Sequence, residues 1–173
     1  AIAFHRDKKS FVTLILKRVD NPLEYGVVVT DQDGRIIRFL EKPSWGEVFS
    51  DTVNTGIYIL SPEVFRYMRR DEKFDFSRDL FPIFMKENKP MYGYITDEYW
   101  CDIGDISAYI QANADVLNGS VRVNIPGSRT DAGIWIGSDT IIDERVYLKA
   151  PAIIGSRCHV REGTVIDSYC VIG

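Results

Sequence analysis

The chain has 173 residues and a formal net charge of −4, and 45% of its residues are hydrophobic. This composition is typical of a globular protein and excludes a disordered or fibrous chain. The acidic balance disfavours nucleic acid as the main partner, and no apolar run approaches the ~20 residues of a membrane span. The three cysteines form no CxxC pair, which disfavours a zinc site or a disulfide framework. We therefore expect a cytoplasmic protein that binds neither nucleic acid nor a membrane.

The N-terminal part of the chain alternates strands and helices, which is typical of an α/β protein. Residues 1–6 have the pattern of the middle of a helix and include no initiator Met, so we expect a piece of a longer protein. A nearly continuous apolar run at 11–16 predicts a strand that is covered on both faces. Residues 25–30 and 35–40 flank an Asp-Gly pair and predict a hairpin with a plain turn, because the residues around it lack the spacing of a calcium loop.

Further elements follow in the same alternation. Residues 55–60 predict a strand, after which Ser61 is the expected N-cap of a helix whose first position is Pro62. Residues 76–86 predict a second helix with Pro82 near its start or at a kink, and 91–95 predict a short strand. Asp105 is the expected N-cap of a third helix that ends at Asn118-Gly119.

The C-terminal part carries a six-residue repeat. A branched aliphatic residue recurs at every sixth position, and a small or β-branched residue follows each of the first six aliphatics by four positions. A short fixed period is typical of a solenoid, and it fits neither the 3.6-residue period of a helix nor a heptad. The aliphatic positions are Ile136, Ile142, Leu148, Ile154, Val160, Ile166 and Ile172.

This repeat resembles the hexapeptide repeat of left-handed parallel β-helices, in which three hexads form one triangular coil. The resemblance implies that the aliphatic and the small residue both point inward, so that Cys158 and Cys170 pack in the interior. We expect a domain at 1–118, a Gly- and Pro-containing connector at 119–133 and a truncated β-helix at 134–173.

Three short motifs in the N-terminal part could carry chemistry. Glu41-Lys42-Pro43 places a charged pair at the end of a predicted strand, where ligands meet α/β sheets. Asn54-Thr55-Gly56 offers an amide, a hydroxyl and a bare backbone. Trp100-Cys101-Asp102-Ile103-Gly104 places one carboxylate beside a glycine. The two histidines, His5 and His159, have no partner visible in the sequence, and we expect packing or solvated roles for them.

Together these motifs resemble the sugar-nucleotidyltransferase family. The matching segments are EYGVV at 24–28, EKP at 41–43, NTGIYI at 54–59 and WCDIG at 100–104, followed by the β-helix that many members carry. The resemblance implies a fold composed of the C-terminal part of a Rossmann-like nucleotidyltransferase domain and a left-handed β-helix. It also implies transfer of a nucleotide from a nucleoside triphosphate to a sugar 1-phosphate, and the wording is closest to mannose-1-phosphate guanylyltransferases.

The resemblance also implies roles for individual residues. Asp102 would be a Mg²⁺ ligand, and Lys42 would pair with the sugar phosphate. Sugar hydroxyls would be held by Glu41, Asn54 and the Gly26 backbone, and the pocket wall would be shaped by Thr55 and Gly56. Trp100 is expected in the core or in the pocket wall.

The family's glycine-rich loop and first metal-binding aspartate precede the matching region and do not occur in this sequence. We therefore expect this chain alone to be inactive, and its full-length parent to be an enzyme that forms homo-oligomers through the β-helix. Three alternatives stay open. They are a glucose-1-phosphate nucleotidyltransferase, a non-catalytic regulatory or assembly subunit of the same fold, and a β-helix acyltransferase that uses His159.

Overall fold

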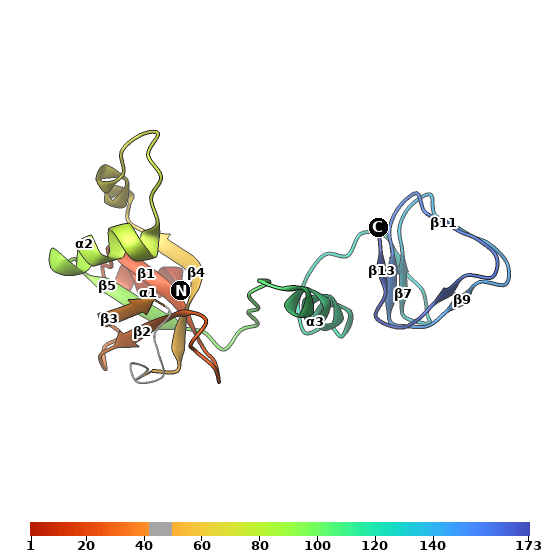
Figure 1. The fold of residues 1–173 in the computed structure, drawn as a ribbon, viewed down its shortest axis with the longest axis horizontal. Coiled ribbons are helices and arrows are strands. Elements are labelled where there is room, and N and C mark those ends of the chain that lie inside the picture. Colours follow the sequence, from red (N-terminus) through yellow and green to blue (C-terminus); the bar gives the residue numbers. More distant parts are fainter. Residues whose placement is uncertain (42–49) are drawn as a thin grey trace. The chain divides into compact units, whose positions relative to one another are not determined.

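The apolar run after Ser10 forms a strand that is buried on both faces, as the sequence predicts. In the computed structural model, which describes residues 1–41 and 50–173, this strand is β1 (Val12–Arg18), and its first five residues are buried. It pairs antiparallel with β4 (Thr52–Leu60) and parallel with β5 (Met91–Ile95). The chain divides into two compact units, Ala1–Trp100 and Cys101–Gly173, and this sheet belongs to the first (Figure 1).

The predicted hairpin is confirmed. It consists of β2 (Gly26–Thr30) and β3 (Ile36–Glu41), and the sheet order is β3-β2-β4-β1-β5. In the turn, Asp31 Oδ1 accepts hydrogen bonds from the backbone N–H groups of Asp33 at 3.0 Å and Arg35 at 2.8 Å. Among the described residues no group of three acidic, Cys or His side chains could hold a metal ion. The Asp31 side chain thus closes the turn through its own backbone neighbours, as Asp commonly does in turns.

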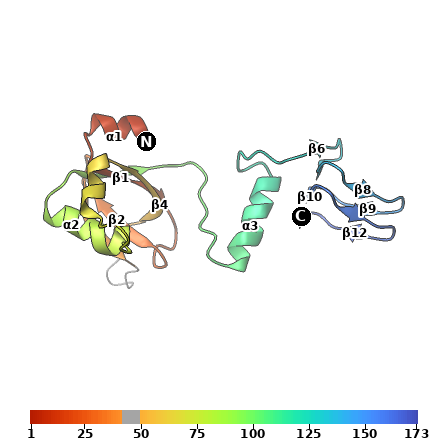
Figure 2. The same cartoon turned by 90° about the horizontal axis from the view of Figure 1, so that it is seen from above.

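Helical segments cover both faces of this sheet (Figures 1 and 2). On one face the apolar side chains of β1 pack against α2 (Phe81–Lys86), and Phe81 and Phe84 have no exposed surface. On the other face lies α1 (Ile2–Asp7), whose Phe4 ring is 5.4 Å from the ring of Tyr94. The two-sided burial of β1 follows from this arrangement.

The segment after β4 agrees with the prediction in part. The predicted helix is present as a 3₁₀ helix, η2 (Pro62–Tyr67), with Pro62 in its first turn, but the Ser61 side chain does not cap it. The Ser61 hydroxyl instead donates to the carbonyl oxygen of Ser10 at 3.1 Å, so it is not available to the first helical N–H groups. The next helical segment is as predicted: a π-helical turn, η3 (Phe76–Leu80), leads into α2, and Pro82 lies in the first turn of α2.

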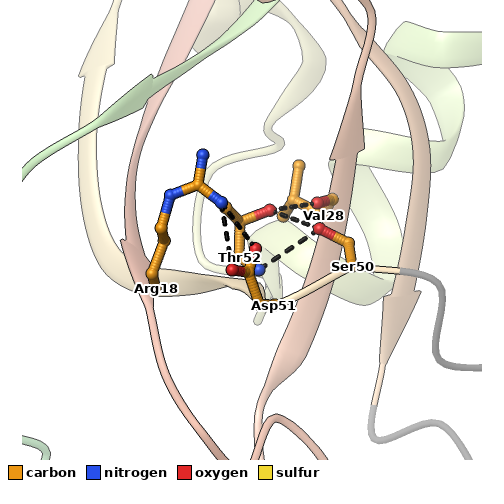
Figure 3. A network of polar contacts seen from close by, with 5 residues as sticks. All are labelled: Arg18, Val28, Ser50, Asp51 and Thr52. Atoms are coloured by element: carbon orange, nitrogen blue, oxygen red, sulfur yellow. Dashed lines mark hydrogen bonds and ion pairs between the residues drawn. The ribbon is translucent and has the colours of Figure 1, made fainter.

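A polar network fixes the start of β4 (Figure 3). The guanidinium of Arg18 donates to both carboxylate oxygens of Asp51, at 2.8 and 3.0 Å. The Thr52 hydroxyl, on a residue that is only 5% exposed, donates to the Val28 carbonyl oxygen at 2.6 Å, and the Ser50 hydroxyl lies 2.7 Å from it. These contacts join β1, β2 and β4 at the start of β4, just before Asn54 in the chain.

The second unit begins with the predicted third helix. This helix, α3 (Ile106–Leu117), is capped by Asp105, whose carboxylate accepts from the N–H of Ala108 at 2.7 Å. No helix of the described residues has the length and apolar character needed to cross a membrane. The connector contributes a two-residue strand, β6 (Ser128–Arg129), that pairs antiparallel with the first strand of the repeat region.

The repeat region forms a parallel β-helix. Ile136, Ile154 and Ile172 are paired in register, so one coil takes 18 residues or three hexads. The aliphatic and small positions form one interior cluster, as predicted, and Cys158 and Cys170 belong to it as free thiols. The strands are β7 (Ile134–Ile136), β8 (Ile141–Ile142), β9 (Tyr147–Leu148), β10 (Ala152–Ile154), β11 (His159–Val160), β12 (Val165–Ile166) and β13 (Val171–Ile172).

Both histidines have a hydrogen-bond partner in the folded chain that the sequence does not reveal. His5 Nδ1 lies 2.9 Å from the hydroxyl of Thr13 between α1 and β1. His159 faces outward as expected, and its Nε2 lies 2.9 Å from Asp143 Oδ1 on the preceding coil. The hydrogen bond from His159 and the backbone N–H of Glu162 lower the pKa of Asp143. The partners lie 8 and 16 residues from their histidines, on other elements of the fold, so only the folded chain reveals them.

The corners of the β-helix require a left-handed backbone at regular positions. Three residues after most aliphatics the backbone has a positive φ, for example 59° at Arg157 and 80° at Gly163. A non-glycine residue with a positive φ costs about 1 kcal/mol of stability, which glycine avoids.

Arg157→Gly should therefore raise the free energy of unfolding of the second unit by about 1 kcal/mol, measured by urea denaturation. Glu144→Gly, at an exposed position without positive φ, is the control and should lower it. Equal effects of the two substitutions would contradict this reading.

His5 makes the stability of the first unit pH-dependent. Burial, and to a lesser extent Arg6, lower the pKa of His5 below its usual value. The unfolded chain therefore binds a proton more readily, and the contribution of His5 is complete above about pH 6.5 and lost as the pH falls through the folded-state pKa. We expect His5→Gln to reduce the loss of stability between pH 7.5 and pH 5 in urea titrations, with His159→Gln as the control in the other unit. An unchanged pH dependence in His5→Gln would refute this assignment.

Candidate functional site

The Asn54-Thr55-Gly56 motif forms a bulge in β4. Leu16 of β1 is opposite Asn54, but Leu14 is opposite Tyr58, so β4 carries two extra residues where β1 has only Ile15 between them. A bulge removes backbone groups from the ladder, and each of these groups then needs another partner. We call residues 54–57 the β4 bulge.

Thr55 supplies the main replacement bond. Its hydroxyl donates to the Ile15 carbonyl oxygen at 2.8 Å and lies 3.3 Å from the backbone N–H of Ile57, from which it accepts. One side chain thus satisfies the opposite strand and stabilises its own loop. Thr55 is half-buried, and its hydroxyl is turned into the sheet.

Asn54 and Gly56 complete the bulge. Asn54 Oδ1 accepts from the backbone N–H of Gly56 at 3.1 Å, and Asn54 Nδ2 donates to the Tyr58 hydroxyl at 2.9 Å. Gly56 has a φ of +79°, which explains why glycine occupies this position, and a Cβ there would meet open space. The Asn54 amide retains one N–H and one oxygen lone pair for a ligand.

An aromatic pair joins the bulge to β2. The Trp100 indole N–H donates to the Thr55 carbonyl oxygen at 3.3 Å, and the Trp100 ring packs edge-on against Tyr25 with centroids 5.6 Å apart. Tyr25 directly precedes Gly26, and Gly26 is in register with Glu41 of β3. The structure therefore brings the Gly26 backbone, the end of β3 and the β4 bulge to one end of the sheet.

Three other expected site groups are not placed in this cluster by the described part of the structure: Lys42, the side chain of Glu41 and Asp102. Lys42 lies outside the described residues, as does the side chain of Glu41. Asp102 belongs to the second unit, in the segment before α3, and its carboxylate is exposed. It has no partner among residues 1–41 and 50–173. Mg²⁺ is usually held by one or two carboxylates together with substrate phosphates, so a single free carboxylate of this kind fits that ion.

Sequence reasoning did not identify Tyr25, Tyr58 and Trp100 as partners of the expected site. Tyr25 and Trp100 occur within the motifs EYGVV and WCDIG, but nothing in the sequence shows that they contact each other. The presence of an aromatic residue in each of these two motifs was the signal in the sequence that could have suggested the contact. Trp100 was expected in the core or in a wall, and its contact with the backbone of Thr55 is the new feature.

With this geometry established, comparison with known proteins identifies the family. A family model described as "Nucleotidyl transferase" matches residues 1–119, and a second, "Bacterial transferase hexapeptide (six repeats)", matches 133–168. The chain belongs to the nucleotidyl transferase family. Its fold is accordingly a Rossmann-like nucleotidyltransferase domain, represented here by a mixed sheet, followed by a β-helix.

Curated relatives cover almost the whole chain. A UTP–glucose-1-phosphate uridylyltransferase of Synechocystis sp. is 36% identical over 99% of this chain and 50% of its own length. A mannose-1-phosphate guanylyltransferase of Mycobacterium tuberculosis is 28% identical over 97% of this chain and 46% of its own length. A glucose-1-phosphate adenylyltransferase of Desulfitobacterium hafniense is 28% identical over 99% and 42%. The chain thus spans about half the length of these relatives.

Two solved structures are similar to the chain. A Bacillus anthracis protein described as a glucose-1-phosphate thymidylyltransferase has a TM-score of 0.56 at 24% identity, covering 72% of this chain and 50% of that one. HddC from Yersinia pseudotuberculosis has a TM-score of 0.51 at 28% identity, covering 64% and 47%. The first of these similarities concerns the fold alone.

The Thr55 hydroxyl should carry much of the stability of the bulge. Thr55→Val keeps the side-chain shape but leaves the Ile15 carbonyl without its donor, which should lower the free energy of unfolding by about 1–2 kcal/mol. Urea denaturation measures the change, and loss of protection of the Ile57 amide from hydrogen exchange localises it.

Thr30→Val is the matched control, because the Thr30 hydroxyl has no hydrogen bond to any part of the chain that the structure describes. It should change stability by much less. A loss of the same size in both variants would show that the Thr55 hydroxyl has no special role.

Proposed function

We propose that this chain forms the sugar-phosphate-binding part of a sugar-1-phosphate nucleotidyltransferase. The observation that carries the proposal is the family match over residues 1–119, within which the EKP, NTG and WCDIG segments all fall. The clustering of the Gly26 backbone with the β4 bulge supports it, because these groups offer an amide and backbone polar groups of the kind that hold sugar hydroxyls.

In the proposed reaction a phosphate oxygen of the sugar 1-phosphate attacks the α-phosphorus of a nucleoside triphosphate. The bond from that phosphorus to the oxygen of the leaving pyrophosphate breaks, and an NDP-sugar forms. The reaction requires in-line positioning and neutralisation of charge more than acid–base chemistry.

Each site residue has a proposed role in this reaction. Lys42 is proposed to pair with the sugar phosphate. The sugar is held by Glu41, Asn54 and the Gly26 backbone, and the wall of the pocket is shaped by Thr55 and Gly56. Asp102 is the proposed Mg²⁺ ligand, and bound Mg²⁺ supplies neutralisation of phosphate charge.

For the substrates, the amino-acid sequences of the motifs support mannose 1-phosphate and GTP. A second candidate pair is glucose 1-phosphate and UTP, which is favoured by the 36% identity to the Synechocystis uridylyltransferase.

We further propose that the protein forms homo-oligomers through the β-helix. Apolar side chains on the outer surface of the β-helix, such as Tyr147 and Val165, are 59% and 68% exposed and could pack against a second copy.

The proposal predicts binding of sugar 1-phosphate by the 173-residue chain in the absence of nucleotide. Lys42→Met should weaken this binding at least tenfold, because it removes the point charge proposed to face the phosphate. Isothermal titration calorimetry or phosphorus NMR measures the affinity. Lys86→Met, at an exposed position on α2, is the control and should leave the affinity unchanged. Equal affinities for all three proteins would exclude Lys42 from the site.

Transfer itself is tested by pyrophosphate release with Mg²⁺. We expect no release from the 173-residue chain, and release from a protein of the relatives' full length that contains these residues. Trials with mannose or glucose 1-phosphate and GTP, UTP or ATP identify the substrate pair, and Asp102→Asn should abolish the activity. A full-length protein that binds sugar phosphate but releases no pyrophosphate with any pair would instead support the regulatory subunit.

A further inference from the structure

One backbone carbonyl of the β4 bulge is bonded by a residue that lies outside both β1 and β4. Thr55 Oγ1 serves the Ile15 carbonyl and the Ile57 N–H, and Asn54 Oδ1 serves the Gly56 N–H. The Thr55 carbonyl oxygen accepts from the Trp100 indole N–H at 3.3 Å. An indole N–H is only a donor, so this contact also fixes the direction of the ring.

The same ring is held from the other side. Tyr25 meets the Trp100 ring with an interplanar angle of 67°, an edge-to-face geometry that is favourable for two aromatic rings. Tyr25 immediately precedes β2, and Val27 of β2 is in register with Val53 of β4. Trp100 therefore contacts one segment at each side of the proposed sugar site: the residue before Gly26 and the residue between Asn54 and Gly56.

We propose that Trp100 is a positioning residue for sugar recognition, which sets the spacing between the Gly26 backbone and the β4 bulge. This inference rests on the proposed function. Trp100 touches neither phosphate nor metal in the proposal; it acts through the Thr55 carbonyl and the Tyr25 ring. Loss of its N–H should loosen the bulge and leave the phosphate-binding charge of Lys42 intact.

The test compares Trp100→Phe with the wild-type chain of 173 residues. Phenylalanine keeps an aromatic ring against Tyr25 but lacks the N–H, so the Thr55 carbonyl loses its donor. We expect the affinity for mannose 1-phosphate or glucose 1-phosphate to fall roughly five- to tenfold, the cost of one hydrogen bond. The affinity for inorganic phosphate should stay within a factor of two. The ratio of the two affinities is decisive, since a general loss of structure would lower both.

Two further measurements complete the design. In the free Trp100→Phe chain the amides of Gly56 and Ile57 should exchange with deuterium faster than in wild type, whereas amides of β1 before the bulge should not. Trp135→Phe is the matched control, because Trp135 lies in the second unit on β7. It should leave the sugar-to-phosphate ratio and the exchange of both amides unchanged.

The outcomes separate the inference from the function on which it rests. If the wild-type chain binds sugar 1-phosphate and Trp100→Phe binds it equally well, the positioning role is wrong and the proposed function stands. If Trp100→Phe loses sugar 1-phosphate and inorganic phosphate to the same extent, the residue has only a structural role and the inference is again overturned. If the wild-type chain binds neither sugar 1-phosphate, the proposed function fails and the inference falls with it.

Discussion

The hydrogen bond from the Thr55 hydroxyl to the Ile15 carbonyl oxygen is the contact on which the candidate site depends. A strand that carries two extra residues leaves backbone groups without ladder partners, and such groups are costly unless something replaces the ladder. Here a threonine, an asparagine and a distant indole supply the replacements. The bulge can therefore expose Gly56 and part of the Asn54 amide at the end of the sheet without breaking the pairing of β4 on either side.

The strands on either side of this bulge are buried or held by polar contacts. β1 is buried on both faces, and a polar network at Thr52 joins β1, β2 and β4 just before Asn54. The bulge is therefore bounded by fixed strand on both sides, and its own conformation is set by side-chain hydrogen bonds. Preorganisation of this kind favours binding, because less conformational freedom is lost when a ligand is held.

The periodic parts of the fold could be predicted from the sequence, and the reason is physical. In the β-helix each hexad meets the same environment as its neighbours, so the inward positions repeat every six residues and are visible as a pattern. The both-face burial of β1 and the Asp-Gly hairpin are likewise visible as short local patterns in the sequence. The helix expected after Ser61 is present, but its side-chain cap is not, because a long-range contact to the Ser10 carbonyl engages the Ser61 hydroxyl.

The site was predictable only in part, for the same reason. The motifs identify which segments resemble the family, but a motif does not show which aromatic ring packs against which backbone carbonyl. Trp100 is 45 residues from Thr55 in the chain, and their contact exists only because β1, β2 and β4 bring the segments together. The side chains of Asn54 and Thr55 supply most of the printed bonds that hold this bulge, whereas the bond from the distant Trp100 is not visible in the sequence. At this bulge the missing piece is a half-buried donor, Trp100, from the segment after β5, which only the folded chain brings against the Thr55 carbonyl.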